Sequence, residues 1–450
     1  MTDNHHWAEL DKRVLWHPFT RMSGWLDSEP LIIDCAEGHY LIDTQGRRYL
    51  DGVSSLWVNL FGHRRPEIDD AIRQQLDRVA HSTLLGLGCT PAVALAARLV
   101  ERTYDPLTRV FYSDNGSTAV EVALKMAYQY WQILGRRSKT RFLALEEAYH
   151  GDTLGSVSVG GIDLFHRIFH PLLFNVSRVP TPYWYRDGDG QDPEGCRDRC
   201  LAALQTTLES HADELAALII EPLVQGAAGI IVQPEGYLRE AVRLSRKHDV
   251  LVIFDEVAVG FGRTGTLFAG EQEGVAPDLL ALAKGISGGY LPLAATLTTD
   301  AIFDAFRECP SELGTFFHGH SYTGNALACA AGLASLDLFD STEILTRLPE
   351  RTARLGRLLN EHVASLEHCG QIRQKGLMVG IELVQDRATR KPYAAEQLVG
   401  VKVCQRARDL GVMLRPLGPV IVLLPPLTLD DAELSLLVTV AAQAIRETTR

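Results

Sequence analysis

The stretch DLLALAKGISGGYLP, residues 278–292, places one lysine directly after a short apolar run and just before a cluster of glycines. The run LLALA (279–283) predicts a buried strand, so Lys284 comes at its carboxyl end. Open α/β sheets bind their ligands at that edge. Burial disfavours the ammonium ion, which lowers the lysine pKa and makes the amine nucleophilic enough to form a Schiff base with an aldehyde. For this residue taken alone, the alternative is a strand-end lysine that reaches solvent.

A second strand ends in a carboxylate at the same predicted edge. In VLVIFDEV (250–257), five apolar residues precede Asp255, which lies one crossover before Lys284. If the cofactor is pyridoxal 5′-phosphate, its pyridine nitrogen must stay protonated. A charge-assisted hydrogen bond from Asp255 would hold that proton and contribute roughly 1.5–3 kcal/mol. A helix cap or a magnesium ligand is the alternative role for this aspartate.

Two further stretches could complete a site for that cofactor. SDNGSTAVEVALKMAYQYW (113–131) follows the strand RVFYS and opens a helix near Ser117–Thr118, where free amides and the positive helix end would face a phosphate. By itself this is only a common helix-cap sequence. YHGDT (149–153) follows another strand and offers Tyr149 as an aromatic face that can stack on a cofactor ring.

The rest of the chain indicates the fold class. Between about residue 60 and residue 335, short β-rich runs alternate with helical patterns, which predicts an α/β fold with a mostly parallel sheet covered by helices on both faces. These runs are RVFYS (109–113), RFLAL (141–145), LAALIIEP (215–222), VLVIFDEV (250–257) and LLALA (279–283). HYLIDTQGRRYLDG predicts a hairpin around Gly46, and GLMVGIELV and VMLRPLGPVIVLLPP add strands near the C-terminus. We expect a large domain over 58–334 and a smaller α+β domain built from 1–57 and 335–450.

Composition narrows the possible functions. The 450 residues carry a net charge of −12 with no long basic block, which argues against a nucleic-acid partner. The polar N-terminus and the interrupted apolar stretch 215–232 predict neither a signal peptide nor a membrane span, and we expect a cytoplasmic protein. The eight cysteines form no paired CxxC motif, so the sequence implies neither a zinc site nor a disulfide framework.

Two motifs resemble binding sites without the context that such sites need. GFGRTG (260–265) matches the dinucleotide fingerprint G-x-G-x-x-G, but Gly270, Gly274 and Pro277 break any long helix after it. We expect a tight, mobile loop that carries Arg263. FHGHSYTGN (317–325) contains an H-x-H pair without a third ligand nearby, so we expect loop histidines and no metal.

Taken in order, the motifs resemble the class III (omega-amino) aminotransferases, a branch of the fold type I enzymes that use pyridoxal phosphate. The resemblance rests on NGS before a helix, YHGDT, IIEP, the strand-end DEV followed by GFGRTG, and the lysine of AKG. WHPFTRM (16–22), DGVSSLWVNLFGH (51–63), HGHSYTGN (318–325) and GVMLRPLG (411–418) are similar to the branch that converts 8-amino-7-oxononanoate to 7,8-diaminononanoate in biotin biosynthesis. The resemblance covers essentially the whole chain.

The resemblance implies a role for each candidate residue at the cofactor. Lys284 would form the Schiff base with the cofactor and act as the proton-moving base, and Asp255 would hold the pyridine nitrogen. Gly116 and Ser117 would cradle the phosphate. Tyr149 would stack on the ring and line the substrate pocket. The reaction would be a ping-pong transamination between a donor amine and a ketone.

The resemblance also implies a partner subunit and a substrate clamp. The segment Gly319, His320, Ser321 would complete the phosphate site of the other subunit, so we expect a homodimer with sites at its interface. Arg415 would bind the carboxylate of 8-amino-7-oxononanoate, a task suited to a bidentate guanidinium. Three candidates line an apolar channel for the acyl chain: Phe19, Leu56 and Trp57.

The amino donor is the point where this sequence departs from the family pattern. Members that use S-adenosylmethionine carry HPYT, SSWW and HGPT, whereas this chain has Phe19, Leu56–Trp57 and His320–Ser321 at those positions. The loss of one flat aromatic ring and one hydroxyl leaves fewer ways to hold an adenosyl group. L-Lysine is therefore favoured over S-adenosylmethionine. The alternatives to this function are another omega-amino aminotransferase, acting on ornithine, 4-aminobutyrate or a diamine, and a non-catalytic nucleotide-binding protein that uses GFGRTG.

Overall fold

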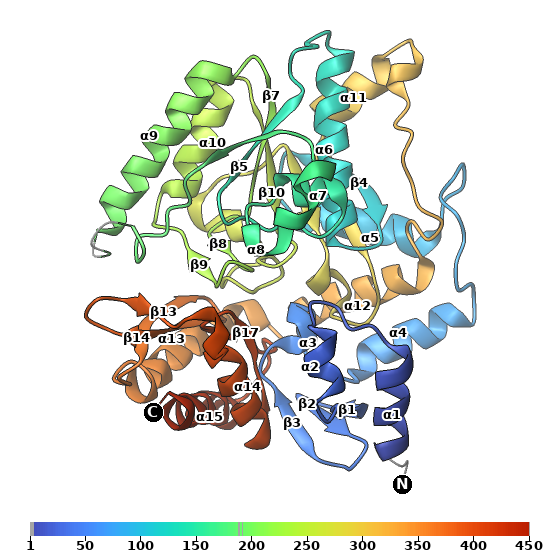
Figure 1. The fold of residues 1–450 in the computed structure, drawn as a ribbon. Helices are drawn as coiled ribbons and strands as arrows, with labels where there is room; N and C mark the ends of the chain where they lie inside the picture. Colours follow the sequence, from blue (N-terminus) through green and yellow to red (C-terminus); the bar gives the residue numbers. More distant parts are fainter. Residues whose placement is uncertain (1–3, 188–189, 191, 450) are drawn as a thin grey trace.

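The computed structural model describes residues 4–187, 190 and 192–449, and its centre is a seven-stranded sheet (Figure 1). In spatial order the strands are β4 (Leu107–Ser113), β12 (Ala294–Thr299), β11 (Leu279–Leu282), β10 (Leu251–Asp255), β7 (Leu215–Ile220), β5 (Arg141–Leu145) and β6 (Val176–Val179). β12 is antiparallel to both of its neighbours, whereas the other neighbouring strands are parallel. The expected mostly parallel sheet is therefore confirmed, and β6 and β12 are two strands that the sequence pattern did not predict.

Both faces of the sheet are buried around its central strands β7, β10 and β11, which explains why these strands are almost continuously apolar. On β10, Ile253 packs into one core cluster, while Val252 and Phe254 pack into a second cluster on the opposite face. Alternation along the strand thus serves two apolar layers instead of one. The helices that contribute to the Ile253 cluster are α6 (Gly116–Ile133), α7 (Leu154–Val159) and α11 (Asp300–Glu308). Those that contribute to the other cluster include α5 (Thr90–Arg102), α9 (Pro193–His211), α10 (Tyr237–Lys247) and α12 (Ala326–Ser341).

The N-terminal region lies beside the carboxyl edge of the large sheet and contains a small sheet of its own. β2 and β3 pair antiparallel on either side of Gly46, as the sequence predicted. Gly46 has φ +80°, a conformation that suits glycine in a tight turn. The elements here are α1 (Asn4–Val14), α2 (Met22–Leu26), β1 (Ile33–Glu37), β2 (Tyr40–Asp43), β3 (Arg48–Asp51), α3 (Ser54–Trp57) and α4 (Pro66–Leu76).

The C-terminal region carries a second small sheet in the order β13-β14-β18-β17, with β15 paired to β14. The C-terminal strand β16 instead completes the N-terminal sheet, in the order β1-β2-β3-β16, because Val412 of β16 pairs in parallel with Leu50 of β3. The elements are α13 (Ile344–His362), β13 (Cys369–Lys375), β14 (Met378–Asp386), β15 (Lys391–Pro392), α14 (Val399–Asp409), β16 (Val412–Met413), β17 (Arg415–Leu417), β18 (Val420–Leu423) and α15 (Asp431–Thr448).

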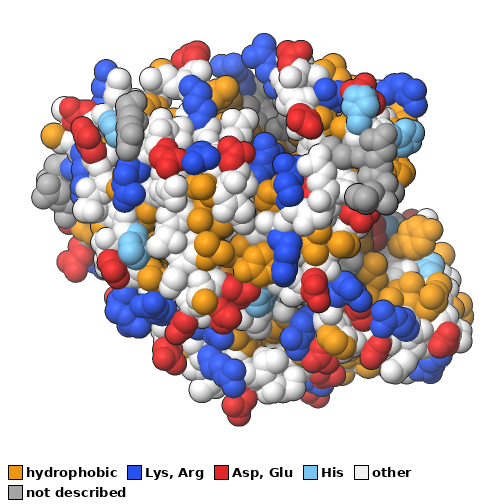
Figure 2. Space-filling model, turned by 90° about the horizontal axis from the view of Figure 1, so that it is seen from below, with side chains coloured by type: hydrophobic (Ala, Val, Ile, Leu, Met, Phe, Trp, Pro, Cys, Tyr) orange, Lys and Arg blue, Asp and Glu red, His pale blue; other side chains and the backbone are white. Residues whose placement is uncertain are grey.

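The pairing of β3 with β16 supports our proposal that the two chain ends form one unit. The expected boundary at residue 334 falls inside α12, so that helix would belong to both domains. Within the described part of the chain, no helix combines the length and apolar character needed to cross a membrane. On the face seen from below in Figure 2, Lys and Arg side chains are interspersed with Asp and Glu side chains, and the described residues form no continuous basic patch there.

Candidate active site

A cavity of about 810 Å³ lies where the carboxyl ends of β10 and β11 meet segments from both ends of the chain. Most of the residues predicted for the site line it. These are Phe19, Leu56, Trp57, Gly116, Ser117, Tyr149, Asp255, Lys284 and Arg415. The structure thus brings together side chains that are almost 400 positions apart in the sequence.

Lys284 lies in this cavity directly beyond β11. Its backbone has φ +48°, which is uncommon for a residue with a side chain, and it begins a short 3-10 turn (Lys284–Ser287). The Nζ atom is 4.8 Å from the centre of the Trp57 ring. Burial lowers the pKa of Lys284 to about 8, although the nearby Asp255 and Glu221 carboxylates oppose that shift. The lysine therefore has a neutral, nucleophilic fraction in the physiological pH range.

Asp255 is the last residue of β10 and is 4% exposed. Its Oδ2 atom is 2.7 Å from Nδ1 of His150, and its Oδ1 accepts a hydrogen bond from the backbone N–H of Val257 at 3.1 Å. The buried Nε2 atom of His150 has no hydrogen-bond partner among the described residues. Because Asp255 lines the cavity, this carboxylate can serve a cationic ring nitrogen there.

The expected phosphate end of the site is built by close backbone approaches. A Cβ on Gly116 would lie 2.6 Å from Val257, and a Cβ on Gly151 would lie 2.0 Å from the Ser117 hydroxyl oxygen. Asn115 caps α6 by accepting from the backbone N–H of Thr118 at 3.1 Å. The first two N–H groups of the helix then remain available to an anion at the cavity wall. These features fit a phosphorylated cofactor.

Tyr149 is held at both its backbone and its hydroxyl. Its N–H donates to Oε1 of Glu221 at 3.1 Å, and its hydroxyl donates to Asp152 at 2.7 Å. Burial raises the pKa of the tyrosine above its usual value. The other oxygen of Glu221 accepts from the N–H of Gly226 at 2.8 Å, and burial raises the pKa of that carboxyl to about 7. Glu221 thus fixes the aromatic wall of the cavity to the sheet edge.

Another part of the cavity wall comes from both ends of the chain. Phe19 is 58% exposed, and its ring meets that of Phe165 edge to face at a centroid distance of 5.5 Å. Leu56 is 48% exposed, whereas Trp57 is almost fully buried. Arg415 reaches the same cavity from β17. The apolar channel and the cation predicted from the resemblance therefore share one cavity with Lys284.

Three predicted site residues lie outside this cavity. Gly319, His320 and Ser321 do not line it, although Nδ1 of His320 is 2.8 Å from Oδ2 of Asp114, which does. The backbone oxygen of Ser321 accepts from His81 at 2.7 Å. Their expected role is toward the other subunit, and it remains a prediction. Among the described residues, no group of three or more His, Cys, Asp or Glu side chains could hold a metal ion.

Among the lining residues that were not assigned a role from the sequence, four stand out by their contacts: His150, Asp152, Glu221 and Phe165. The first two belong to YHGDT and the third to IIEP, so the motifs were visible. Their contacts depend on which strand ends are neighbours in space. Phe165 lies in the short helix α8 (Asp163–His166) and has no motif that would have revealed it.

The expectation of a mobile loop at GFGRTG is wrong. Arg263 is 1% exposed, and its guanidinium donates to the carbonyl oxygens of Pro425 at 2.6 Å and Asn59 at 2.9 Å. Burial lowers its pKa to about 9. Gly262, at φ +85°, provides the turn, and the arginine joins the segment after α3 to the C-terminal region. No residue of 260–265 lines the cavity.

Comparison with known proteins shows which family this chain matches. Residues 23–445 match the family described as "Aminotransferase class-III". The chain is 57% identical over 438 residues to the adenosylmethionine-8-amino-7-oxononanoate aminotransferase of Nitratidesulfovibrio vulgaris, covering 97% of this chain and 81% of that relative. The similarly named Geobacter sulfurreducens protein is 53% identical, with 98% of this chain and 97% of the relative covered.

Solved structures agree with this match. The crystal structure of the correspondingly named aminotransferase from Methanocaldococcus jannaschii has a TM-score of 0.93 and 43% identity, and 99% of this chain and 100% of that chain are covered. An amine transaminase from an uncultivated Pseudomonas species, solved in its PLP-bound form, has a TM-score of 0.93 and 38% identity, and the match covers 97% of this chain and 99% of the other.

Proposed function

The chain belongs to the class III aminotransferases, enzymes that use pyridoxal 5′-phosphate, and we propose that it transfers an amino group to 8-amino-7-oxononanoate to give 7,8-diaminononanoate. The observation that carries this proposal is that Arg415 and Lys284 line one cavity whose wall includes Phe19, Leu56 and Trp57. A guanidinium can bind a carboxylate, and an apolar wall suits the chain that links that carboxylate to a reacting ketone. The names of the relatives point to the same acceptor.

The cofactor supplies an aldehyde that exchanges amino groups and a protonated ring that accepts the electron pair released at the neighbouring carbon. We assign Gly116 and Ser117 to its phosphate, because the start of α6 faces the cavity. Asp255, oriented by His150, would hold the proton on the ring nitrogen. Tyr149, whose backbone N–H is held by Glu221, would cover one face of the ring.

Lys284 has two tasks in this proposal. Its neutral Nζ would hold the cofactor through the aldehyde, which burial favours by lowering the lysine pKa to about 8. As a free amine, the same atom would be placed to move a proton from the amine-bearing carbon of the substrate. The Trp57 ring, 4.8 Å from Nζ, limits the space into which the side chain can swing. The lysine thus stays near the reacting carbon.

We propose L-lysine as the amino donor. The relatives carry adenosylmethionine in their names, whereas the cavity of this chain presents Phe19 and Leu56 where the family pattern for that donor has a tyrosine and a tryptophan. Neither side chain can donate a hydrogen bond to an adenosyl group. A slender aliphatic amine does not need those contacts.

The decisive experiment separates acceptor from donor. Purified enzyme loaded with pyridoxal phosphate is given 8-amino-7-oxononanoate with either lysine or S-adenosylmethionine, and 7,8-diaminononanoate is measured by mass spectrometry. Product with lysine supports the whole proposal, and product only with S-adenosylmethionine overturns the donor assignment. No product with either donor overturns the acceptor assignment. The Lys284→Ala variant is the blank.

Another omega-amino aminotransferase activity remains the second candidate, because amine and omega transaminases are among the matching structures. Ornithine, 4-aminobutyrate and a simple diamine are therefore included as donors, with pyruvate as acceptor. Turnover of one of these without any diaminononanoate formation would favour this second function.

We also propose that the enzyme is a cytoplasmic homodimer whose 319–321 segment completes the neighbouring site. Two observations support a partner: the segment lies outside its own cavity, and the flanking Phe317 and Tyr322 are 76% and 65% exposed. Light scattering should give twice the monomer mass. A fully active monomer would contradict this proposal.

A further inference from the structure

The C-terminal sheet carries two rows of residues across four strands. Cross-strand pairing places Arg415, Val422, Gly380 and Arg373 in one row, from β17 through β18 and β14 to β13. The neighbouring row consists of Leu417, Val420, Glu382 and Gln371. Directly opposed residues, and residues two apart on a strand, point to the same face of a sheet. Both rows therefore face the same way.

Both rows reach the active-site cavity at their β17 end. Arg415 and Leu417 both line it. The other end lies three strand spacings away, which is about 14 Å at the usual ~4.8 Å between strands. That distant end takes no part in the chemistry proposed above, and its side chains do not line the cavity.

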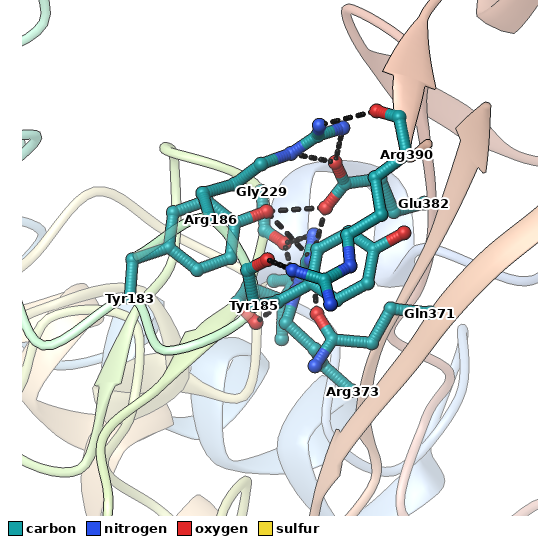
Figure 3. A network of polar contacts seen from close by, with 9 residues as sticks. Tyr183, Tyr185, Arg186, Gly229, Gln371, Arg373, Glu382 and Arg390 are labelled. Carbon is teal, nitrogen blue, oxygen red and sulfur yellow. Dashed lines mark hydrogen bonds and ion pairs between the residues drawn. The ribbon is translucent and has the colours of Figure 1, made fainter. Parts of the chain in front are cut away.

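The distant end is a buried polar network (Figure 3). The side chains of Arg373 and Glu382 are 3% and 4% exposed and form an ion pair. Arg373 also donates to Gln371 at 2.8 Å and to the hydroxyl of Tyr183 at 2.8 Å. Glu382 accepts from Arg186 at 2.8 Å through Nε. The arginine holds the pKa of Glu382 below its usual value despite the opposing effect of burial.

This network is hydrogen-bonded to the 226–230 turn, which forms another part of the cavity wall. Arg373 donates to the carbonyl oxygen of Gly229 at 2.7 Å and to that of Ile230 at 3.1 Å. Ala227, in the same turn, lines the cavity. A Cβ on Gly380, in the Arg415 row, would lie 2.7 Å from the Gly229 oxygen, so the sheet and the turn approach as closely as backbones allow.

We propose that Arg373 and Glu382 are positioning residues, which lock the C-terminal sheet onto the 226–230 turn and thereby set where the Arg415 guanidinium stands relative to Lys284. The inference rests on the proposed function, which assigns Arg415 to the substrate carboxylate. Because the four strands are hydrogen-bonded to one another, a shift of β13 and β14 relative to the turn would also displace Arg415 on β17. Acceptors are then selected by the distance between their carboxylate and their ketone.

A network that only stabilised the fold would affect every ligand alike. The test therefore compares octanoate with 1-octanol, which share a chain and differ in the carboxylate, by calorimetric titration of the loaded enzyme. The variants are Arg373→Met, which removes the grip, and Gly380→Ala, whose added methyl pushes the turn away without changing any charge. Arg243→Met, which removes an exposed ion pair with Glu240 on α10, is the matched control. Thermal unfolding reports whether each variant is folded.

We expect both test variants to lower the preference for octanoate over octanol by about tenfold, because a displacement of ~1 Å is enough to weaken a directional contact strongly. Octanol affinity should change by less than about twofold, since apolar contacts are not directional. The control should behave as wild type.

The outcomes separate the two proposals. If Arg415→Met abolishes the preference while folded Arg373→Met and Gly380→Ala keep it, the positioning role is wrong and the clamp stands. Equal weakening of both ligands means a structural role only and also overturns the inference. If wild type shows no preference, or Arg415→Met retains it, the clamp itself fails, and the inference falls with it. Should Arg373→Met not fold, Gly380→Ala alone decides.

Discussion

The two ends of the active-site cavity are built in different ways. The end that we propose for the cofactor consists of Asp255, Lys284 and the start of α6, all at strand ends of one buried sheet. The end that we propose for the substrate is assembled from Phe19 and Leu56, which are half exposed, and from Arg415 near the other end of the chain. A rigid sheet edge suits chemistry that every substrate shares, and surface segments suit recognition, which varies between relatives.

The largest expected effect tests the shared end. Lys284→Ala should slow transamination by roughly 10³-fold or more with every substrate pair, because both the covalent link and the proton carrier are lost. Visible absorbance during the donor half-reaction measures the rate. Lys139→Met is the control, because that lysine is buried and donates only to backbone carbonyls. It should lose stability while keeping its rate per folded molecule. Loss of less than tenfold in Lys284→Ala would contradict the assignment.

The next effect belongs to the recognition end. Arg415→Met should raise KM for 8-amino-7-oxononanoate by about 10–100-fold and leave kcat within about twofold, since a contact to the carboxylate is made equally before and during reaction. Steady-state kinetics with varied acceptor give both constants. Arg307→Met, which removes an exposed ion pair with Asp304, serves as the control. A fall in kcat at constant KM would place Arg415 at the chemistry instead.

The shared end should also show a distinctive pH dependence. The neutral amine of Lys284 is the reactive form, so incorporation of pyridoxal phosphate into the unloaded protein should slow about tenfold per unit below pH 8 and level off above it. Burial causes this lowered pKa, and the Glu221 carboxylate opposes it. Glu221→Gln should therefore move the midpoint to lower pH. Absorbance recorded from pH 6.5 to 9.5 measures both profiles, and an upward shift in Glu221→Gln would refute the account.

The smallest effect concerns the helix that faces the phosphate. Asn115→Ala removes the cap of α6 and should lower the free energy of unfolding by about 1 kcal/mol. Asp430→Ala removes an equivalent cap from α15, far from the cavity, and should cost a similar amount. Only the first variant should also weaken retention of pyridoxal phosphate, by a fewfold, as measured by dialysis. Equal retention in both variants would show that the order of the α6 start does not matter for binding.

The cofactor end could be predicted largely from the sequence, because its logic is local. Lys284 and Asp255 each follow an apolar run, and strands of a parallel sheet end at a common edge, so their proximity needed no structure. The sequence could not predict the hydrogen bonds that hold the cavity-lining residues in place. His150 reaches Asp255, and Glu221 reaches the backbone of Tyr149, only because β5, β7 and β10 happen to be neighbours.

The substrate end was predicted through resemblance alone. Nothing in the pattern around Phe19 or Arg415 indicates that they share a cavity, since Phe19 lies in the loop between α1 and α2 and Arg415 lies in β17. Arg263 shows the opposite failure. Its glycine-rich surroundings predicted a mobile loop, yet tertiary packing buries the guanidinium against carbonyl oxygens from both chain ends. Local composition reports backbone freedom and not what later packs against it.

The parallel contact between Leu50 and Val412 sets the order in which the molecule can be completed. A ribosome releases β3 long before its partner strand exists, and closing so long a loop is slow and entropically unfavourable. The central sheet, whose strands all lie between residues 107 and 299, needs no such wait. During synthesis, the central sheet that carries Lys284 and Asp255 can therefore form first. The part of the cavity wall that includes Arg415 can be completed only after the C-terminal strands have been made.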